Sequence, residues 1–214
     1  MKRPIVRPAW VPLLVLLALA AAQPARAQDA GVKLRIHGGI VQPVASTGDY
    51  FKFGPSAGVD VGWPLSERVD AVLDLDMDWF NTTDIYPTPT TNLWRYRVGI
   101  EGALVGEPTG GSFLLKGLAG VGATTIRSHK FWLLSRQPYT YEGENINQTS
   151  LTATGGLRLG MRTPDGLTWW LSGKLNWSPL SDLNKDALQE LADNKLDPLG
   201  SAMSVAITLG VTLF

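Results

Sequence analysis

Several segments of this chain alternate in polarity, and their charged residues occupy only one of the two alternating sets of positions. In Val69–Phe80 every second residue is apolar, and four aspartates lie among the residues between. The same separation recurs in Leu93–Val105, Ser112–Thr125, Ser150–Arg162 and Leu167–Ser178, where no charge falls among the apolar residues. Because a strand turns successive side chains to opposite sides, this alternation predicts β-strands with one apolar and one charged face.

Turn-rich stretches divide the chain into eight such segments. The predicted strands are Val32–Val41, Ser56–Trp63, Val69–Phe80, Leu93–Val105, Ser112–Thr125, Ser150–Arg162, Leu167–Ser178 and Ala202–Phe214. Short connections such as Pro64–Arg68 alternate with long ones such as Ile126–Thr149. This alternation predicts an all-β fold: an eight-stranded antiparallel up-and-down transmembrane barrel with short periplasmic turns and long extracellular loops. Within the last long loop, Leu183–Leu191 has helical spacing and predicts a short surface helix.

The first 27 residues have the composition of an export signal. Lys2, Arg3 and Arg7 precede an apolar run that is too short for a membrane-spanning helix, and Ala25–Ala27 forms a small-x-small cleavage site. We therefore expect residues 1–27 to be removed and residues 28–214 to form one barrel domain.

Composition excludes several classes of function. The chain has no cysteine, so thiol catalysis, disulfides and thiolate metal sites are excluded. Formal charges balance over the whole chain, and the predicted signal carries only basic residues. The remaining domain is therefore slightly acidic, which gives no reason to expect a nucleic-acid partner.

Three features predict that the apolar face points outward. Glycines stud the charged face, where a narrow barrel needs space for facing Arg and Lys side chains. Aromatic residues of the apolar face lie near strand ends, as expected at two membrane interfaces. The chain also stops on its last strand. The predicted interface aromatics are Trp63, Trp79, Trp94, Trp169 and Trp177. The opposite orientation would describe a soluble lipocalin-like ligand-binding barrel, which is one alternative.

With this pattern over Val32–Phe214, the chain resembles the small outer-membrane barrels typified by the OmpA membrane domain and OmpX. The resemblance implies residence in the outer membrane of a Gram-negative bacterium. It also implies delivery by periplasmic chaperones to the barrel-assembly machinery, with terminal Phe214 as the assembly signal. Phe214 departs from the usual pattern because it is out of phase with the apolar residues before it. Either a bulge restores the phase or Leu213 takes the membrane position.

Hairpin register predicts that unlike charges meet inside the barrel. Aligning Trp79 with Trp94 places Asp78 opposite Arg95 and Asp76 opposite Arg97, and aligning Leu104 with Phe113 places Glu101 opposite Lys116. The predicted lumen charge network comprises Asp74, Asp76, Asp78, Arg95, Arg97, Glu101, Lys116 and Arg158. An eight-stranded barrel is just wide enough for side chains to fill it, so we expect a packed lumen.

No catalytic, cofactor or metal site is predicted. The row of Asp74, Asp76 and Asp78 offers hard oxygen ligands, but arginines on the next strand compete for them. Ser128 and His129 supply residue types used by lipid A-modifying hydrolases, without any recognisable catalytic motif.

These observations predict a monomeric, non-enzymatic barrel with a structural, adhesive or envelope role. Its loops form the contact surface. Aromatics and cations in the third long loop, such as Phe131 and Trp132, suggest contact with outer-membrane lipids and lipopolysaccharide. A narrow channel for ions or small solutes and a lipid A-modifying hydrolase remain alternatives.

Overall fold

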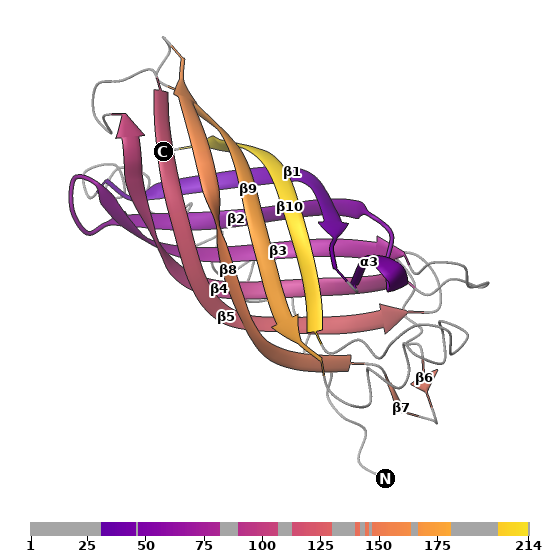
Figure 1. The fold of residues 1–214 in the computed structure, drawn as a ribbon. Coiled ribbons are helices and arrows are strands. Elements are labelled where there is room, and N and C mark those ends of the chain that lie inside the picture. The colour runs from indigo at the N-terminus through magenta and orange to yellow at the C-terminus, as the bar shows by residue number, and fades with distance from the viewer. Residues whose placement is uncertain are drawn as a thin grey trace.

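Eight long strands pair with their neighbours all the way round, so the sheet closes into a barrel (Figure 1). The structure is a computed structural model that describes residues 31–45, 47–81, 90–106, 113–129, 140–141, 144–145, 147–163, 167–180 and 201–213. The barrel strands are β1 (Lys33–Pro43), β2 (Gly54–Pro64), β3 (Val69–Asn81), β4 (Thr90–Gly106), β5 (Phe113–His129), β8 (Asn147–Arg162), β9 (Thr168–Pro179) and β10 (Ser201–Thr212). A separate small hairpin joins β6 (Thr140–Tyr141) to β7 (Glu144–Asn145).

Every barrel strand is antiparallel to both neighbours, in the order β1-β10-β9-β8-β5-β4-β3-β2. The predicted eight-stranded up-and-down barrel is therefore confirmed. We call the end of the barrel at which short connections join β2 to β3 and β4 to β5 the turn end. The opposite end, where β3 finishes and β4 begins, is the loop end.

Several strands run further towards the loop end than predicted. β4 begins at Thr90 rather than Leu93, and β5 continues to His129 rather than stopping at Thr125. Their added residues are mostly polar, so hydropathy gave no sign of a strand. Backbone hydrogen bonds nevertheless continue the ladder, because pairing does not depend on side-chain polarity. β2 is also longer than predicted, extending over Gly54–Pro64.

β1 and β10 close the barrel in an unbroken register that runs from Pro43 opposite Ser204 to Arg35 opposite Thr212. Beyond it, the Leu213 amide donates to the Leu34 carbonyl over 2.8 Å, and the Leu213 side chain is exposed. No bulge interrupts β10 within the described residues. Phe214 lies outside them.

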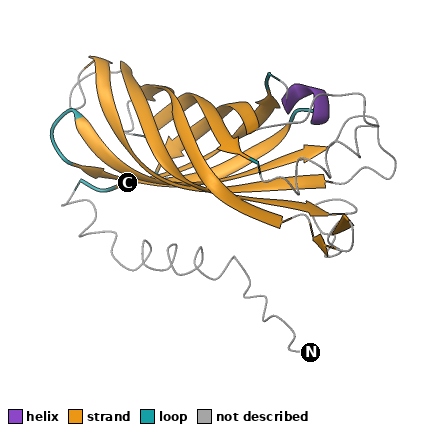
Figure 2. Cartoon of the chain, turned by 60° about the horizontal axis from the view of Figure 1, so that its bottom comes forward, coloured by secondary structure: helices purple, strands orange, loops and turns teal. Residues whose placement is uncertain are grey.

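A short helix, α3 (Thr47–Tyr50), lies at the loop end between β1 and β2, and Figure 2 shows it at one end of the barrel. Its Thr47 hydroxyl donates to the Ser201 carbonyl over 3.3 Å and accepts from the Met203 amide over 2.8 Å. These bonds fasten α3 to the start of β10. This helix was not predicted, because four residues are too few to show periodicity. The helix predicted around Leu183–Leu191 lies outside the described residues.

In the part of the chain that the structure describes, no helix has both the length and the apolar character needed to cross a membrane.

The two faces of the sheet are distributed as the alternation predicts. Apolar side chains of the outer face are exposed, up to 76% for Leu151. Charged side chains such as Arg97 and Glu101 are 1% exposed and lie inside. This arrangement is the opposite of a lipocalin-like barrel, in which apolar side chains fill the interior.

Candidate functional site: a charged lumen

All eight residues of the predicted network are buried inside the barrel. Further charged residues join them there. The ion pairs of the described residues comprise the carboxylates of Asp60, Asp70, Asp74, Asp76, Asp78 and Glu101 and the cations of Lys33, Arg35, Arg95, Arg97, Lys116, Arg158 and Lys174, with His37 beside them. Buried charges are tolerated when they are paired, and each of these residues has at least one oppositely charged partner.

Glu101 is the centre of the cluster nearer the turn end. Its carboxylate lies 2.7 Å from Arg35 Nη1, 2.8 Å from Lys116 Nζ and 2.6 Å from Arg158 Nη1. Arg158 also donates to Asp60 over 2.9 Å, and Arg35 pairs with the same aspartate. The cluster therefore ties together β1, β2, β4, β5 and β8 across the lumen.

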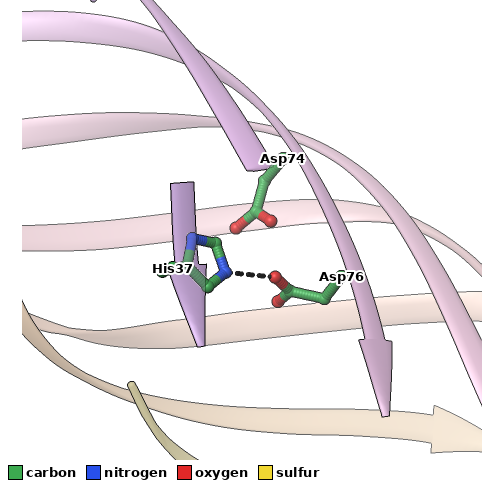
Figure 3. Close-up of side chains that lie close together, drawn as sticks. All are labelled: His37, Asp74 and Asp76. Atoms are coloured by element: carbon green, nitrogen blue, oxygen red, sulfur yellow. Dashed lines mark hydrogen bonds and ion pairs between the residues drawn. The ribbon is translucent and has the colours of Figure 1, made fainter. Parts of the chain in front are cut away.

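A second cluster surrounds Asp74 and Asp76 in the middle of the barrel. Lys174 Nζ lies 2.7 Å from Asp74 Oδ2 and 3.1 Å from Asp76 Oδ2, and Arg97 pairs with both carboxylates. His37 Nε2 lies 2.6 Å from Asp76 Oδ1, as Figure 3 shows. His37 Nδ1 is 3.8 Å from an oxygen of Asp60, so the imidazole links the two clusters.

A third level continues the polar lumen towards the loop end. Asp78 pairs with Arg95, whose Nη2 donates to Ser204 Oγ over 3.2 Å. Beside them, the Ser178 hydroxyl lies 3.0 Å from the hydroxyls of Thr124 and Thr152. Charge thus gives way to neutral hydroxyls as the mouth is approached.

The predicted hairpin register between β3 and β4 is wrong by two residues. Arg95 lies opposite Asp76, and Arg97 lies opposite Asp74. The ion pairs nevertheless join Arg95 to Asp78 and Arg97 to Asp76, as the prediction supposed. Arginine is long enough to reach the diagonal neighbour of its direct partner, about 7–8 Å away. The pairs therefore form along the diagonal of the ladder.

The β4–β5 register is also wrong by two residues. Glu101 lies opposite Leu118, and Lys116 lies opposite Ala103, with an irregularity between Ala103 and Val105. The Lys116 ammonium still reaches Glu101 at 2.8 Å. A bulge adds a residue to one strand, which hydropathy alternation does not reveal.

Apolar side chains fill the lumen near the loop end. Phe51, which follows α3, contacts Phe80 with ring centroids 5.7 Å apart. We call the buried apolar cluster at this end the apolar plug; it consists of Val41, Phe51, Phe80, Leu93, Ile126, Leu180, Ala202 and Ala206. Its members from the strands share the inner face with the charged residues. The lumen therefore changes from ionic to apolar before it reaches the mouth.

Trp170 lies inside the barrel near the turn end, and the sequence analysis did not single it out. Its ring is 6% exposed and lies 5.4–6.0 Å from the charged groups of Arg35, Lys116 and Arg158. Its Nε1 donates to Thr212 Oγ1 over 2.6 Å. Cations over an aromatic face are attracted to it. The available signal was parity, because Trp170 shares its face of the strand with Lys174.

The inner glycines serve two purposes, of which the sequence suggested one. A side chain at Gly62 would meet the Arg35 guanidinium, and one at Gly160 would overlap the Trp170 ring. At Gly99 and Gly156, however, the space is filled by the backbone of the neighbouring strand. Making room for Arg and Lys is thus only part of the reason. Glycines such as Gly99 and Gly156 instead allow neighbouring strands to approach each other closely where the sheet coils.

A metal site is not supported at the acidic row. Ligand atoms of His37, Asp74 and Asp76 lie within 4.8 Å of one another (Figure 3). Arg97 and Lys174 already neutralise both carboxylates. A cation there would have to displace them. The geometry fits a salt-bridged interior.

Five tryptophans were predicted at membrane interfaces, and all belong to the outer face. Trp63 and Trp169 are exposed near the turn end, and Trp177 is exposed near the loop end. Trp79 and Trp94 are half-buried, also near the loop end. Their role at the interface remains a prediction.

Comparison with known proteins supports the same architecture. The family described as outer membrane protein beta-barrel domain matches residues 11–196. Neisserial surface protein A has a similar structure, with a TM-score of 0.56, 11% identity, and coverage of 85% of this chain and 96% of that chain. The N-terminal barrel domain of Pseudomonas aeruginosa OprF gives a TM-score of 0.42 at 14% identity, covering 85% and 96% of the two chains. No curated protein sequence matches the chain.

The family match spans most of the chain, and its description agrees with the apolar outside and charged inside of the barrel. The soluble lipocalin-like alternative is therefore wrong. The chain belongs to the outer membrane protein beta-barrel domain family and resides in the outer membrane of a Gram-negative bacterium.

Proposed function

We propose that this protein is a sealed, non-enzymatic barrel with a structural or adhesive role in the cell envelope. The loop end faces the cell surface, and its connections form the contact surface. The observation that carries the proposal is the filled lumen. Trp170, two ionic clusters and the apolar plug succeed one another from end to end.

Between its two ionic clusters, the lumen offers little room for a conduction pathway. The cavity lined by Asp74, Arg97, Glu101 and Arg158 has a volume of about 20 Å³. A cavity needs roughly 10–15 Å³ to hold one water molecule, so this one has room for about one. An ion would have to break buried ion pairs to pass. This favours a sealed barrel over a narrow channel.

Conductance decides between these functions. Purified protein, folded in detergent and showing heat-modifiable gel migration, is added to a planar lipid bilayer, with a porin as the positive control. We expect no steady unitary currents, because both ends of the lumen are closed. Reproducible unitary currents from the folded protein would overturn the proposal in favour of the channel.

The proposal includes the absence of enzymatic activity. His37 lies in the lumen with its imidazole held by Asp76, away from the acyl chains that a lipid A hydrolase must reach. Lipid A from cells with and without the protein should give the same mass spectrum. A deacylated product that depends on the protein would identify a hydrolase instead.

Assembly and partners complete the proposal. Residues 1–27 direct export, and chaperones deliver residues 28–214 to the barrel-assembly machinery, with Phe214 as the signal. Residues 1–30 and Phe214 lie outside the described residues. The exposed apolar face supports contact with outer-membrane lipids. The barrel acts as a monomer, and lipopolysaccharide surrounds its loop end.

A further inference from the structure

A polar row crosses the outer face of three adjacent strands at the loop end. Trp79 of β3 lies opposite Asn92 of β4, and Asn92 lies opposite Arg127 of β5. By strand alternation all three belong to the outer face. Along β5, the outer-face residues from Phe113 to Thr125 carry no charge, so Arg127 is the first cation met beyond the apolar belt.

Each residue of this row has a polar atom without a partner. Trp79 Nε1, Asn92 Oδ1 and Arg127 Nε are buried atoms that make no hydrogen bond. Asn92 is only 5% exposed. An unpaired buried polar group is unfavourable, and these three lie side by side on neighbouring strands at the loop end. Two are donors and one is an acceptor.

An apolar groove adjoins the row on the same face. It has a volume of about 300 Å³ and is lined mainly by Ile36, Ala57, Val59, Leu75, Met77, Trp79 and Trp94. Trp79 belongs to both features, with its indole ring on the groove and its Nε1 among the unpaired atoms of the row. The combined site is therefore apolar on the side of the barrel's middle and polar on the side of the loop end.

We propose that this site binds one phosphorylated glycolipid of the outer leaflet. Arg127 binds a headgroup phosphate, because a guanidinium forms strong charge-assisted hydrogen bonds with phosphate oxygens. Trp79 Nε1 and Asn92 Oδ1 bind sugar hydroxyls, and one acyl chain occupies the groove. The inference rests on the proposed function only in placing the loop end at the cell surface.

The experiment counts bound lipid by native mass spectrometry on the full chain folded in micelles. The probes are bis-phosphorylated lipid A, the same lipid with its phosphates removed, and phosphatidylglycerol. We expect the phosphorylated lipid A to bind best. Arg127→Gln should weaken its binding about tenfold, the effect of losing a hydrogen bond to a charged group. Trp79→Phe should weaken it less, because it removes only the N–H.

The matched control is Arg68→Gln, which removes an exposed arginine from the connection between β2 and β3 at the turn end. This variant should bind lipid A like the wild type. Heat-modifiable migration checks that each variant is folded. If Arg127→Gln does not fold, Trp79→Phe and Asn92→Ala still test the site.

Four results would overturn the inference. They are equal binding by the wild type and the row variants, equal binding of dephosphorylated lipid A, equal binding of phosphatidylglycerol, and displacement of lipid A by millimolar inorganic phosphate. None of these results bears on conductance, so a failed lipid site and a failed sealed barrel are distinguishable.

Discussion

At the scale of single residues, stability depends on how each buried charge is shared. Glu101 is 1% exposed and contacts three cations that come from three other strands. Removing one charge of a buried pair leaves its partner uncompensated, which costs more than the pair contributes. Neutralising Glu101 should therefore remove a carboxylate partner from three buried cations at once.

Glu101→Gln should lower the free energy of unfolding in micelles by about 3–5 kcal/mol, the range for breaking a buried ion pair. Urea titration followed by tryptophan fluorescence measures it. The control Glu67→Gln changes an exposed glutamate in the connection between β2 and β3 and should shift stability by less than about 0.5 kcal/mol. Equal stability of the two variants would contradict the role of Glu101.

Gly160→Val should destabilise the barrel by about 1–3 kcal/mol, because the new side chain overlaps the Trp170 ring. Gly173→Val provides the matched control, since nothing lies within 4 Å of a Cβ added at this outer position. Melting of both variants in micelles measures the difference. Similar melting temperatures would show that Trp170 does not need the space.

Residue parity predicted which side chains point into the lumen, but it could not predict which of them pair with one another. Parity places Arg35, Asp60 and Lys174 on the charged face, but the predicted network did not include them. Their partners lie on strands distant in sequence, such as Arg158 for Asp60. Trp170 was not singled out, although it shares the parity of Lys174 and therefore belongs to the charged face.

At the scale of the strand, the two faces have opposite requirements. Leu75 of β3 lies on the outer face and lines the lipid-side groove. Val72 of the same strand lies on the inner face beside the small cavity near Glu101. A charge on the outer face would enter hydrocarbon, whereas a hydroxyl on the inner face joins a polar lumen.

Leu75→Arg should reduce insertion of the folded barrel, with a cost of about 2–4 kcal/mol for an arginine at the bilayer midplane. Val72→Thr should insert like the wild type. Heat-modifiable migration of outer-membrane fractions measures both. If the two variants insert equally well, the orientation of the faces is contradicted.

Strand existence and facing could be predicted because period-two alternation reports them directly. Strand ends and register could not. Thr90 and His129 extend β4 and β5 by backbone pairing alone, and the irregularity near Ala103 shifts the β4–β5 register. Both effects depend on backbone geometry rather than on side-chain polarity.

At the scale of the whole molecule, the sealed barrel that we propose is closed in more than one place. The apolar plug fills one end, Trp170 lies at the other, and the ionic clusters fill the space between them. Loss of one of these closures should therefore leave the others intact.

Phe80→Ala removes a ring that is 2% exposed at the centre of the plug and should cost about 3–5 kcal/mol of stability. It should not produce conductance, because the ionic clusters remain. Thermal melting and planar-bilayer recording of the same preparation measure the two effects. Steady currents from this variant would show that the plug alone closes the lumen.

The long-range ion pairs also have a consequence for the order of assembly. Arg35 meets Asp60 across a single hairpin, but Arg158 and Lys174 reach carboxylates about a hundred residues earlier in the chain. Until the late strands arrive, a growing sheet would expose unmatched ions to hydrocarbon. Insertion into the bilayer and final closure are therefore coupled steps, and a half-built sheet is excluded from the lipid by its own charges.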